Sequence, residues 1–351
     1  MDREELIVRR LTNQYLLRPA PKDEVVRGLC GMQAQFLPNV RHSLKIRSSD
    51  YDPDTFPDGL VRNWTIRRTM HVFLAEDLPL FLHCKNGADY RSHDWSGRTF
   101  WNRRDCWALT PERQAYLART ILDALASGPR TRDELKEVCR AAGMTQPEED
   151  SMFDQWGGGI RELCERGFMN AVVSEQKAYC LSPDFTPIPE EEAELVLAER
   201  YFTNFGPASV HDAMYFFHTT AAKVKRWLTR LPVKSCICGE NALYYLDGGR
   251  ESGGSAPDCL FLAGFDQFML GYEKKESVCL RQENLRQIFN LAGIVMPAVL
   301  LYGEAAGRWK QKNGKLTVEL FRAATARERE SIEEKARALW PGLSKLEVVL
   351  L

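Results

Sequence analysis

Apolar residues recur at helical spacing at the start of the chain. Leu6, Leu11 and Tyr15 repeat at intervals of four or five, which predicts an amphipathic helix over residues 3–18 that ends before Pro19. A second helix is predicted to end at Gly31, a residue suited to a left-handed cap. A third helix is predicted from Val40 to Ile46. The N-terminal region therefore begins with helices.

A stretch of alternating residues follows between residues 60 and 74. One face would carry Trp64, Ile66, Met70 and Val72, and the other Thr65, Arg67, Thr69 and His71. This pattern predicts either a strand pair or a short helix followed by a strand. A histidine in such a run usually makes a structural hydrogen bond, but here an arginine and two threonines share its face.

Two helix openings farther along match each other. Gly128-Pro129-Arg130-Thr131 is followed by Glu134, and Gly206-Pro207-Ala208-Ser209 by Asp212, as in a capping box. Each opening starts a helix. One further helix is predicted before it and one after it, and a strand pair follows. Around the first opening, the other two helices are predicted at 112–127 and 151–166, and the strands at 168–173 and 178–181. Around the second opening, the other two helices are predicted at 191–205 and 220–231, and the strands at 234–238 and 242–246. Three helices and a hairpin form the winged-helix order, so we predict two such units in tandem, with the N-terminal region as a third.

The last hundred residues change to strand patterns. A linker rich in glycine and serine covers residues 247–257, and Asn313-Gly314 is a strong hairpin-turn signal. Strands are expected at 259–263, 277–280, 295–302, 305–311 and 315–322, with a helix at 327–339 and a strand near 347–349. The predicted fold class is α+β, with three tandem winged-helix units followed by a C-terminal β-barrel, closed or half-closed. The predicted domains are 1–106, 107–189, 190–248 and 256–351.

Composition is that of an ordinary globular protein. Of 351 residues, 44% are hydrophobic and 27% charged, and the longest apolar run, 294–302, contains Pro297. We expect no membrane span, and the charged N-terminus favours the cytoplasm, with association with the nucleoid. Ten scattered cysteines fit reduced thiols. The only close pair, Cys236 and Cys238, is a weak metal signal, so we predict neither metal nor cofactor.

The formal net charge is −1, but the basic residues are clustered. Two segments contain no acidic residue and form candidate phosphate-binding patches. The first comprises Lys223, Lys225, Arg226, Arg230 and Lys234, and the second Arg308, Lys310, Lys312 and Lys315. Either run is also consistent with a merely solvated face.

The most distinctive polar segment is Gln33-Ala34-Gln35, directly after the second helix. On extended backbone the two amides share one face and Ala34 points the other way. A glutamine amide donates and accepts hydrogen bonds without titrating, so a pair suits the binding of a water or a sugar oxygen. The alternative is that the amides only brace loop backbone.

Together with the segment 64–71 and the Gly206-Pro207 opening, these residues resemble the AlkZ/YcaQ-type DNA glycosylases almost from end to end. Phe265-Asp266, Gly271-Tyr272 and the segment 303–309 extend the resemblance. It implies three winged helices with a C-terminal barrel, and a catalytic centre containing the glutamine pair. It also implies excision of alkylated purines, including crosslinked ones. One departure is Arg68, because the family usually has glycine between the matched Arg67 and Thr69.

The resemblance leads to an expected function with named residues. We expect a monomeric DNA repair glycosylase that acts on double-stranded DNA without base-sequence specificity, with Gln33 and Gln35 as catalytic residues. The expected DNA-binding residues are Arg67, Thr69, His71, Lys223, Lys225, Arg226, Asp266, Arg308, Lys310, Lys312 and Lys315. The alternatives are a non-catalytic winged-helix DNA-binding regulator and a protein-interaction scaffold.

Overall fold

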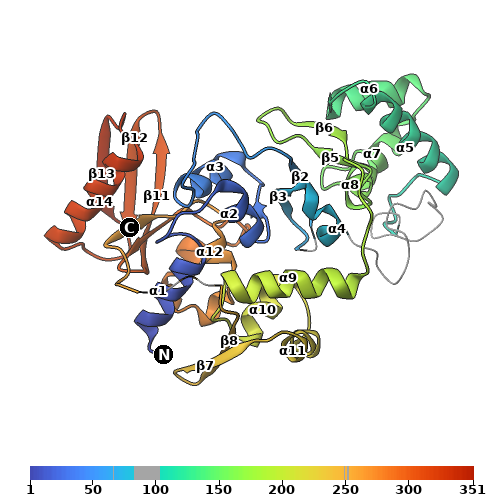
Figure 1. The fold of residues 1–351 in the computed structure, drawn as a ribbon. Helices are drawn as coiled ribbons and strands as arrows, with labels where there is room; N and C mark the ends of the chain where they lie inside the picture. Colours follow the sequence, from blue (N-terminus) through green and yellow to red (C-terminus); the bar gives the residue numbers. More distant parts are fainter. Residues whose placement is uncertain (66, 83–102, 249, 251–252) are drawn as a thin grey trace. The chain divides into compact units, whose positions relative to one another are not determined.

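The computed structural model describes residues 1–65, 67–82, 103–248, 250 and 253–351. The chain forms two compact units: unit 1 consists of residues 1–57 and 198–351, and unit 2 of residues 58–197 (Figure 1). The predicted face of Ile66 and the linker residues 249, 251 and 252 lie outside the described residues. The four predicted domains are finer than this division and stay predictions.

Unit 1 begins with helices α1 (Arg3–Asn13) and α2 (Lys22–Gly28), strand β1 (Met32–Gln33) and helix α3 (Leu37–Lys45). Asp2 caps α1 by accepting a hydrogen bond from the Glu5 amide at 2.8 Å. The helix ends at Asn13, so the prediction to residue 18 was too long; Tyr15 has a φ of 63°, which no right-handed helix accommodates. Helix α2 ends at Gly28, three residues before the predicted end at Gly31, but Gly31 has the predicted left-handed conformation, with a φ of 76°.

Unit 1 resumes at residue 198, within helix α9 (Glu190–Asn204). Two helices and a hairpin follow: α10 (Val210–Phe217), α11 (Ala221–Arg230), β7 (Lys234–Cys238) and β8 (Asn241–Tyr245). Ser209 and Asp212 form the predicted capping box at the start of α10. The Tyr201 ring of α9 packs against Phe216 of α10 with centroids 4.8 Å apart, which joins the two helices. The predicted order of helices and hairpin is therefore present.

The C-terminal part of unit 1 is a five-stranded sheet in the order β13-β12-β11-β10-β9, antiparallel except for β12 with β13. Its strands are β9 (Cys259–Phe261), β10 (Ala298–Leu301), β11 (Glu304–Lys312), β12 (Lys315–Leu320) and β13 (Lys345–Leu350). Helix α14 (Ala326–Leu339) packs on the sheet through Ile332 and Ala336 (Figure 1). Among the described residues β9 and β13 are open edges, so the predicted closed barrel is not found.

Short helices occupy the connection from β9 to β10, where a strand over 277–280 was predicted. They are α12 (Gln267–Leu270), η2 (Lys274–Glu276), η3 (Gln282–Asn284) and α13 (Leu285–Ile288). The strand prediction was wrong, because Cys279 and Leu280 are buried within a loop rather than along a ladder. The apolar run from Val278 to Leu280 reflects burial without strand pairing.

Unit 2 contains the strand pair predicted between residues 60 and 74. Strands β2 (Leu60–Trp64) and β3 (Met70–Leu74) form an antiparallel hairpin, and β2 also pairs with β5 (Met169–Ala171). Strands β6 (Ala178–Leu181) and β4 (Arg130–Thr131) complete the order β3-β2-β5-β6-β4. Residues predicted to belong to separate domains thus share one sheet.

Helices pack around this sheet. They are η1 (Ala75–Asp77), α4 (Leu78–Phe81), α5 (Pro111–Leu125), α6 (Arg132–Ala141), α7 (Gln146–Met152) and α8 (Gly158–Glu165). Thr131 and Glu134 form the predicted capping box. The single helix predicted over 151–166 is wrong: Gly157 and Gly158 have φ values of 144° and 52°, which separate α7 from α8. No helix in the described parts of the chain is long and apolar enough to cross a membrane.

Candidate active site and nucleic-acid interface

The glutamine pair lies on the short segment between α2 and α3. Met32 and Ala34 are buried, whereas Gln33 is half-buried and Gln35 is exposed. This alternation is the one expected if the two amides share an accessible face and the residues between them anchor the backbone. Leu37 and Val40 bury the inner side of α3 and hold the far end of the segment. The amides therefore project from a fixed frame.

A buried ion pair connects the end of α3 to the start of α12. The Arg47 guanidinium donates from Nη2 to Asp266 Oδ1 at 2.6 Å and from Nη1 to Oδ2 at 2.9 Å, and both side chains are 0% exposed. Asp266 Oδ1 also accepts from the Phe268 amide at 2.9 Å, which caps α12. Asp266 was expected to contact DNA. The structure corrects this expectation, because its carboxylate is enclosed in the protein and engaged by Arg47.

Arg67, Thr69 and His71 come together at the β2–β3 turn, as their spacing predicts. His71 Nδ1 lies 2.9 Å from the Thr69 carbonyl oxygen and 3.2 Å from Thr65 Oγ1, and Nε2 lies 3.2 Å from Arg67 Nη1. Burial, reinforced by the charge of Arg67, lowers the pKa of His71 to about 3. The neutral ring therefore donates from Nδ1 to the carbonyl and accepts at Nε2 from the guanidinium.

This cluster corrects the expected role of Arg67 and His71. Both side chains are buried, so in this structure they brace the turn instead of presenting charge to a phosphate. The adjacent Arg68 is exposed and has a φ of 61°. The residue at which the sequence departs from the expected pattern thus occupies a left-handed backbone conformation.

The first basic run lies on α11, except for Lys234, which begins β7. Val224 and Trp227 are buried, and Lys225 and Arg226 are exposed, while Lys223 is half-buried. Helical spacing explains this separation, because residues 224 and 227 lie on one side. Lys225 and Arg226 thereby give α11 a positive surface suited to phosphates.

The second basic run is partly neutralised by acids from neighbouring strands. Glu319 on β12 pairs with Arg308 at 2.6 Å and with Lys310 at 2.9 Å. Glu347 on β13 pairs with Lys315 at 2.7 Å. Lys312 is exposed beside the Asn313-Gly314 turn. The local sequence contains no acid, and only strand pairing brings these carboxylates to the cations.

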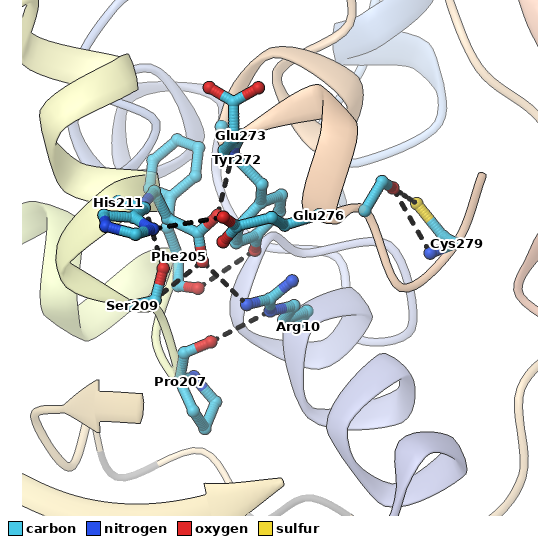
Figure 2. Close-up of polar contacts among 12 residues, drawn as sticks. Arg10, Phe205, Pro207, Ser209, His211, Tyr272, Glu273, Glu276 and Cys279 are labelled. Atoms are coloured by element: carbon cyan, nitrogen blue, oxygen red, sulfur yellow. Dashed lines mark hydrogen bonds and ion pairs between the residues drawn. The ribbon is translucent and has the colours of Figure 1, made fainter. Parts of the chain in front are cut away.

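Sequence reasoning missed a buried polar network in unit 1, which Figure 2 shows. Arg10 lies over the Tyr272 ring at 3.8 Å and donates to the Pro207 carbonyl oxygen at 2.9 Å and to Asp212 at 3.2 Å. The Tyr272 hydroxyl donates to the Phe205 carbonyl oxygen at 2.9 Å, and burial raises its pKa. Two motifs of the sequence resemblance, Gly206-Pro207 and Gly271-Tyr272, belong to this network and could have indicated it. The network holds α1, α10 and the segment after α12 together.

The described residues contain no group of three histidine, cysteine or acidic side chains arranged to hold a metal ion.

A family comparison defines the class of this protein. The sequence model of the family described as DNA glycosylase AlkZ-like matches residues 26–340, so the chain belongs to this family. DNA glycosylases are hydrolases that act on N-glycosyl bonds, and this chain is an enzyme of that class. The resemblance recognised in the sequence is confirmed.

Two individual comparisons agree with the family assignment. An interstrand DNA cross-link repair glycosylase of Streptomyces sahachiroi is 25% identical over 370 residues, covering 97% of this chain and 96% of the relative. The solved structure of Streptomyces sahachiroi DNA glycosylase AlkZ matches with a TM-score of 0.77 at 20% identity, covering 99% of this chain and 98% of the other. The fold of that enzyme is therefore shared along nearly the whole chain.

Proposed function

We propose that this protein releases alkylated purines, including crosslinked ones, from duplex DNA, with Gln33 and Gln35 positioning the attacking water. The observation that carries the proposal is the exposure pattern of residues 32–35, in which Gln33 is half-buried and Gln35 exposed while Met32 and Ala34 are buried. In a DNA glycosylase, such a pair is placed to bind water and a sugar oxygen together.

The chemistry of the substrate explains why amides suffice. A purine alkylated at N7 is cationic and leaves as a neutral base when the N-glycosidic bond breaks. The leaving group then needs no protonation, and the oxocarbenium-like sugar is a strong electrophile. Catalysis depends mainly on holding water close to the anomeric carbon, which proximity and hydrogen bonding supply.

We further propose that the DNA is bound through its phosphates, without sequence specificity, by a monomer. The outer face of α11 and the exposed Lys312 support the phosphate contacts, since they are cationic and solvent-exposed. We interpret α10, α11 and the β7–β8 hairpin as a winged helix, and likewise α5, α6, α8 and the β5–β6 hairpin. Lys310, Lys315 and Arg308 contribute less charge because Glu319 and Glu347 pair with them.

The test is base release from a duplex containing a single N7-methylguanine. Gln35→Ala is expected to slow single-turnover release by about 100-fold or more with nearly unchanged DNA affinity, because water positioning acts on the transition state. Gln146→Ala, which alters an exposed glutamine of unit 2, is the matched control. Gln35→Glu separates the two functions of the amide, since a carboxylate accepts but does not donate.

Activity in Gln35→Glu with a new acidic limb in its pH profile would assign the accepting oxygen as the essential group. Complete loss would assign the donating nitrogen. Wild-type protein that binds the duplex but releases no cationic alkylpurine, with Gln35→Ala altering only thermal stability, would overturn the proposal in favour of a non-catalytic DNA-binding regulator.

A further inference from the structure

An exposed aromatic ring directly follows the glutamine pair. Phe36 is 50% exposed although it is one of the largest apolar side chains in the protein. Single exposed apolar residues are common, so exposure alone assigns no role. The position does carry information, because Gln35 and Phe36 are consecutive and both exposed, at a bend where the alternation of residues 32–35 ends.

The inner side of the Phe36 ring is supported. Its centroid lies 6.1 Å from that of Phe265, with the two planes inclined by 37°. The Phe36 backbone is extended, with φ −130° and ψ 115°, and forms the N-terminal cap of α3. The ring thus has one supported side and one that solvent reaches.

The supporting ring is itself held in a costly conformation. Phe265 is buried and has a φ of 55°, which costs an aromatic residue roughly 1 kcal/mol or more. Its amide donates to the Val295 carbonyl oxygen at 3.1 Å. The next residue is Asp266, which is fixed by the buried ion pair with Arg47.

The ion pair joins the two segments that carry the rings. Phe36 stands at the start of α3 and Arg47 just after its end, while Phe265 directly precedes Asp266. The motif Phe265-Asp266 is explained by this arrangement, since the carboxylate positions the support of an exposed ring. A preorganised ring loses little conformational entropy when a ligand stacks on it.

We propose that Phe36 recognises the alkylated purine by stacking on it through a cation–π interaction. The proposal rests on the proposed function, which supplies a cationic base beside the glutamines. The face of a phenyl ring carries negative potential, so it attracts an N7-alkylated purine more strongly than a neutral purine. Phe36 thereby contributes selection of the lesion, whereas Gln33 and Gln35 contribute the hydrolysis.

The kinetic consequence differs from that of losing a glutamine. During cleavage the positive charge leaves the base and develops on the sugar, so the cation–π attraction is strongest before the bond breaks. An interaction of this kind lowers the dissociation constant of the lesion but does not accelerate the chemical step. Gln35→Ala should have the opposite signature, a slower step with unchanged binding.

The experiment compares two duplexes that differ in the charge of one base. The first contains a 2′-fluorinated N7-methylguanine nucleotide, which resists cleavage, and the second contains the neutral isostere 7-methyl-7-deazaguanine with the same sugar. The wild type is expected to bind the cationic duplex more tightly by a factor between about 2 and 30. In Phe36→Leu, which retains apolar volume without a π system, this ratio should fall to about 1.

Further variants control for folding and for general loss of an aromatic residue. Phe36→Tyr should retain the ratio, and Tyr116→Leu, which alters an exposed aromatic residue of unit 2, should leave it unchanged. Gln35→Ala should also retain it. With cleavable N7-methylguanine, Phe36→Leu should require more enzyme for half-maximal release but reach at least the wild-type rate at saturation.

Three results would overturn the stacking role: a wild-type ratio of 1, an unchanged ratio in Phe36→Leu, or a lower saturating rate in Phe36→Leu with the ratio intact. Failure of the proposed function is separately visible. In that case the wild type releases no base, whether or not the charge ratio is present.

Discussion

Arg68 shows how one backbone angle links stability to sequence. The residue is exposed, and its φ of 61° is accessible to glycine without the Cβ clash that other residues incur. We expect Arg68→Gly to raise the free energy of unfolding of unit 2 by about 1 kcal/mol, because relief of the clash exceeds the added chain entropy of glycine. Denaturant unfolding of both variants measures this difference.

Arg68→Ala is the appropriate comparison for that experiment. Alanine removes the guanidinium but retains the Cβ atom, so it should be no more stable than the wild type. Equal stabilisation by alanine and glycine would mean that the charge of Arg68, and not its backbone conformation, is the unfavourable feature.

His42 gives unit 1 a defined dependence on pH. Its ring stacks on Trp340 with centroids 5.6 Å apart, lies 4.9 Å from Trp309, and donates from Nε2 to the Phe261 carbonyl oxygen at 2.7 Å. Burial lowers the pKa of His42 to about 4. Because the unfolded chain takes up this proton near pH 6.5 and the folded chain only near 4, stability is lost as the pH falls through this interval, by about 3 kcal/mol.

The contribution of His42 can be measured against a variant that does not titrate. Urea unfolding of the wild type, followed by tryptophan fluorescence, should weaken between pH 7 and pH 4. His42→Gln should be less stable at pH 7 but lose less stability over the same range. Identical losses in both proteins would exclude His42 as the source; the buried His71 then remains, with a lowered pKa of about 3.

At the scale of elements, helix α11 and hairpin β11–β12 show that a basic run and a basic surface are different things. Both runs lack acids in their local sequence. On α11 the helical period separates Lys225 and Arg226 from the buried side, and these residues remain exposed. On the hairpin, strand neighbours supply Glu319 and Glu347. The helix therefore offers more uncompensated charge than the hairpin.

This difference predicts the salt dependence of DNA binding. The double variant Lys225→Gln, Arg226→Gln should weaken binding to undamaged duplex DNA and reduce the slope of log affinity against log salt concentration by about 1 to 2. Binding should be measured by titration at several salt concentrations. Arg337→Gln, which removes a surface cation already paired with Glu333, serves as the control. An unchanged slope in the double variant would place α11 away from the DNA.

Most elements of the fold were predictable because their signals are local. The capping boxes at Thr131 and Ser209, the left-handed Gly31 and the Asn313-Gly314 turn all appear where the sequence places them. The errors arose where glycine conformation or burial interrupted a pattern. Gly157 and Gly158 divided a predicted helix, and residues 277–280 proved to be a buried loop.

For the whole molecule, the order of elements along the chain did not determine the grouping of elements in space. Unit 1 combines residues 1–57 with 198–351, and unit 2 consists of the segment between them. The sheet of unit 2 joins β2 to β5 across more than one hundred residues. Periodicity contains no information about which distant strand a strand edge will meet, so domain boundaries inferred from sequence order remain predictions.

The sequence by itself determined the family, the positions of most helices and hairpins, and the glutamine pair as the candidate catalytic group. These depend on residue types at short spacing, which the chain displays directly. Only the tertiary structure decided which side chains are accessible. Asp266, Arg67 and His71 are buried and hold the frame, while Phe36 remains exposed beside Gln35. The physical reason is that burial and ion pairing depend on segments far apart in the sequence. Arg47, for example, pairs with Asp266 more than two hundred residues away, and no local pattern specifies this contact.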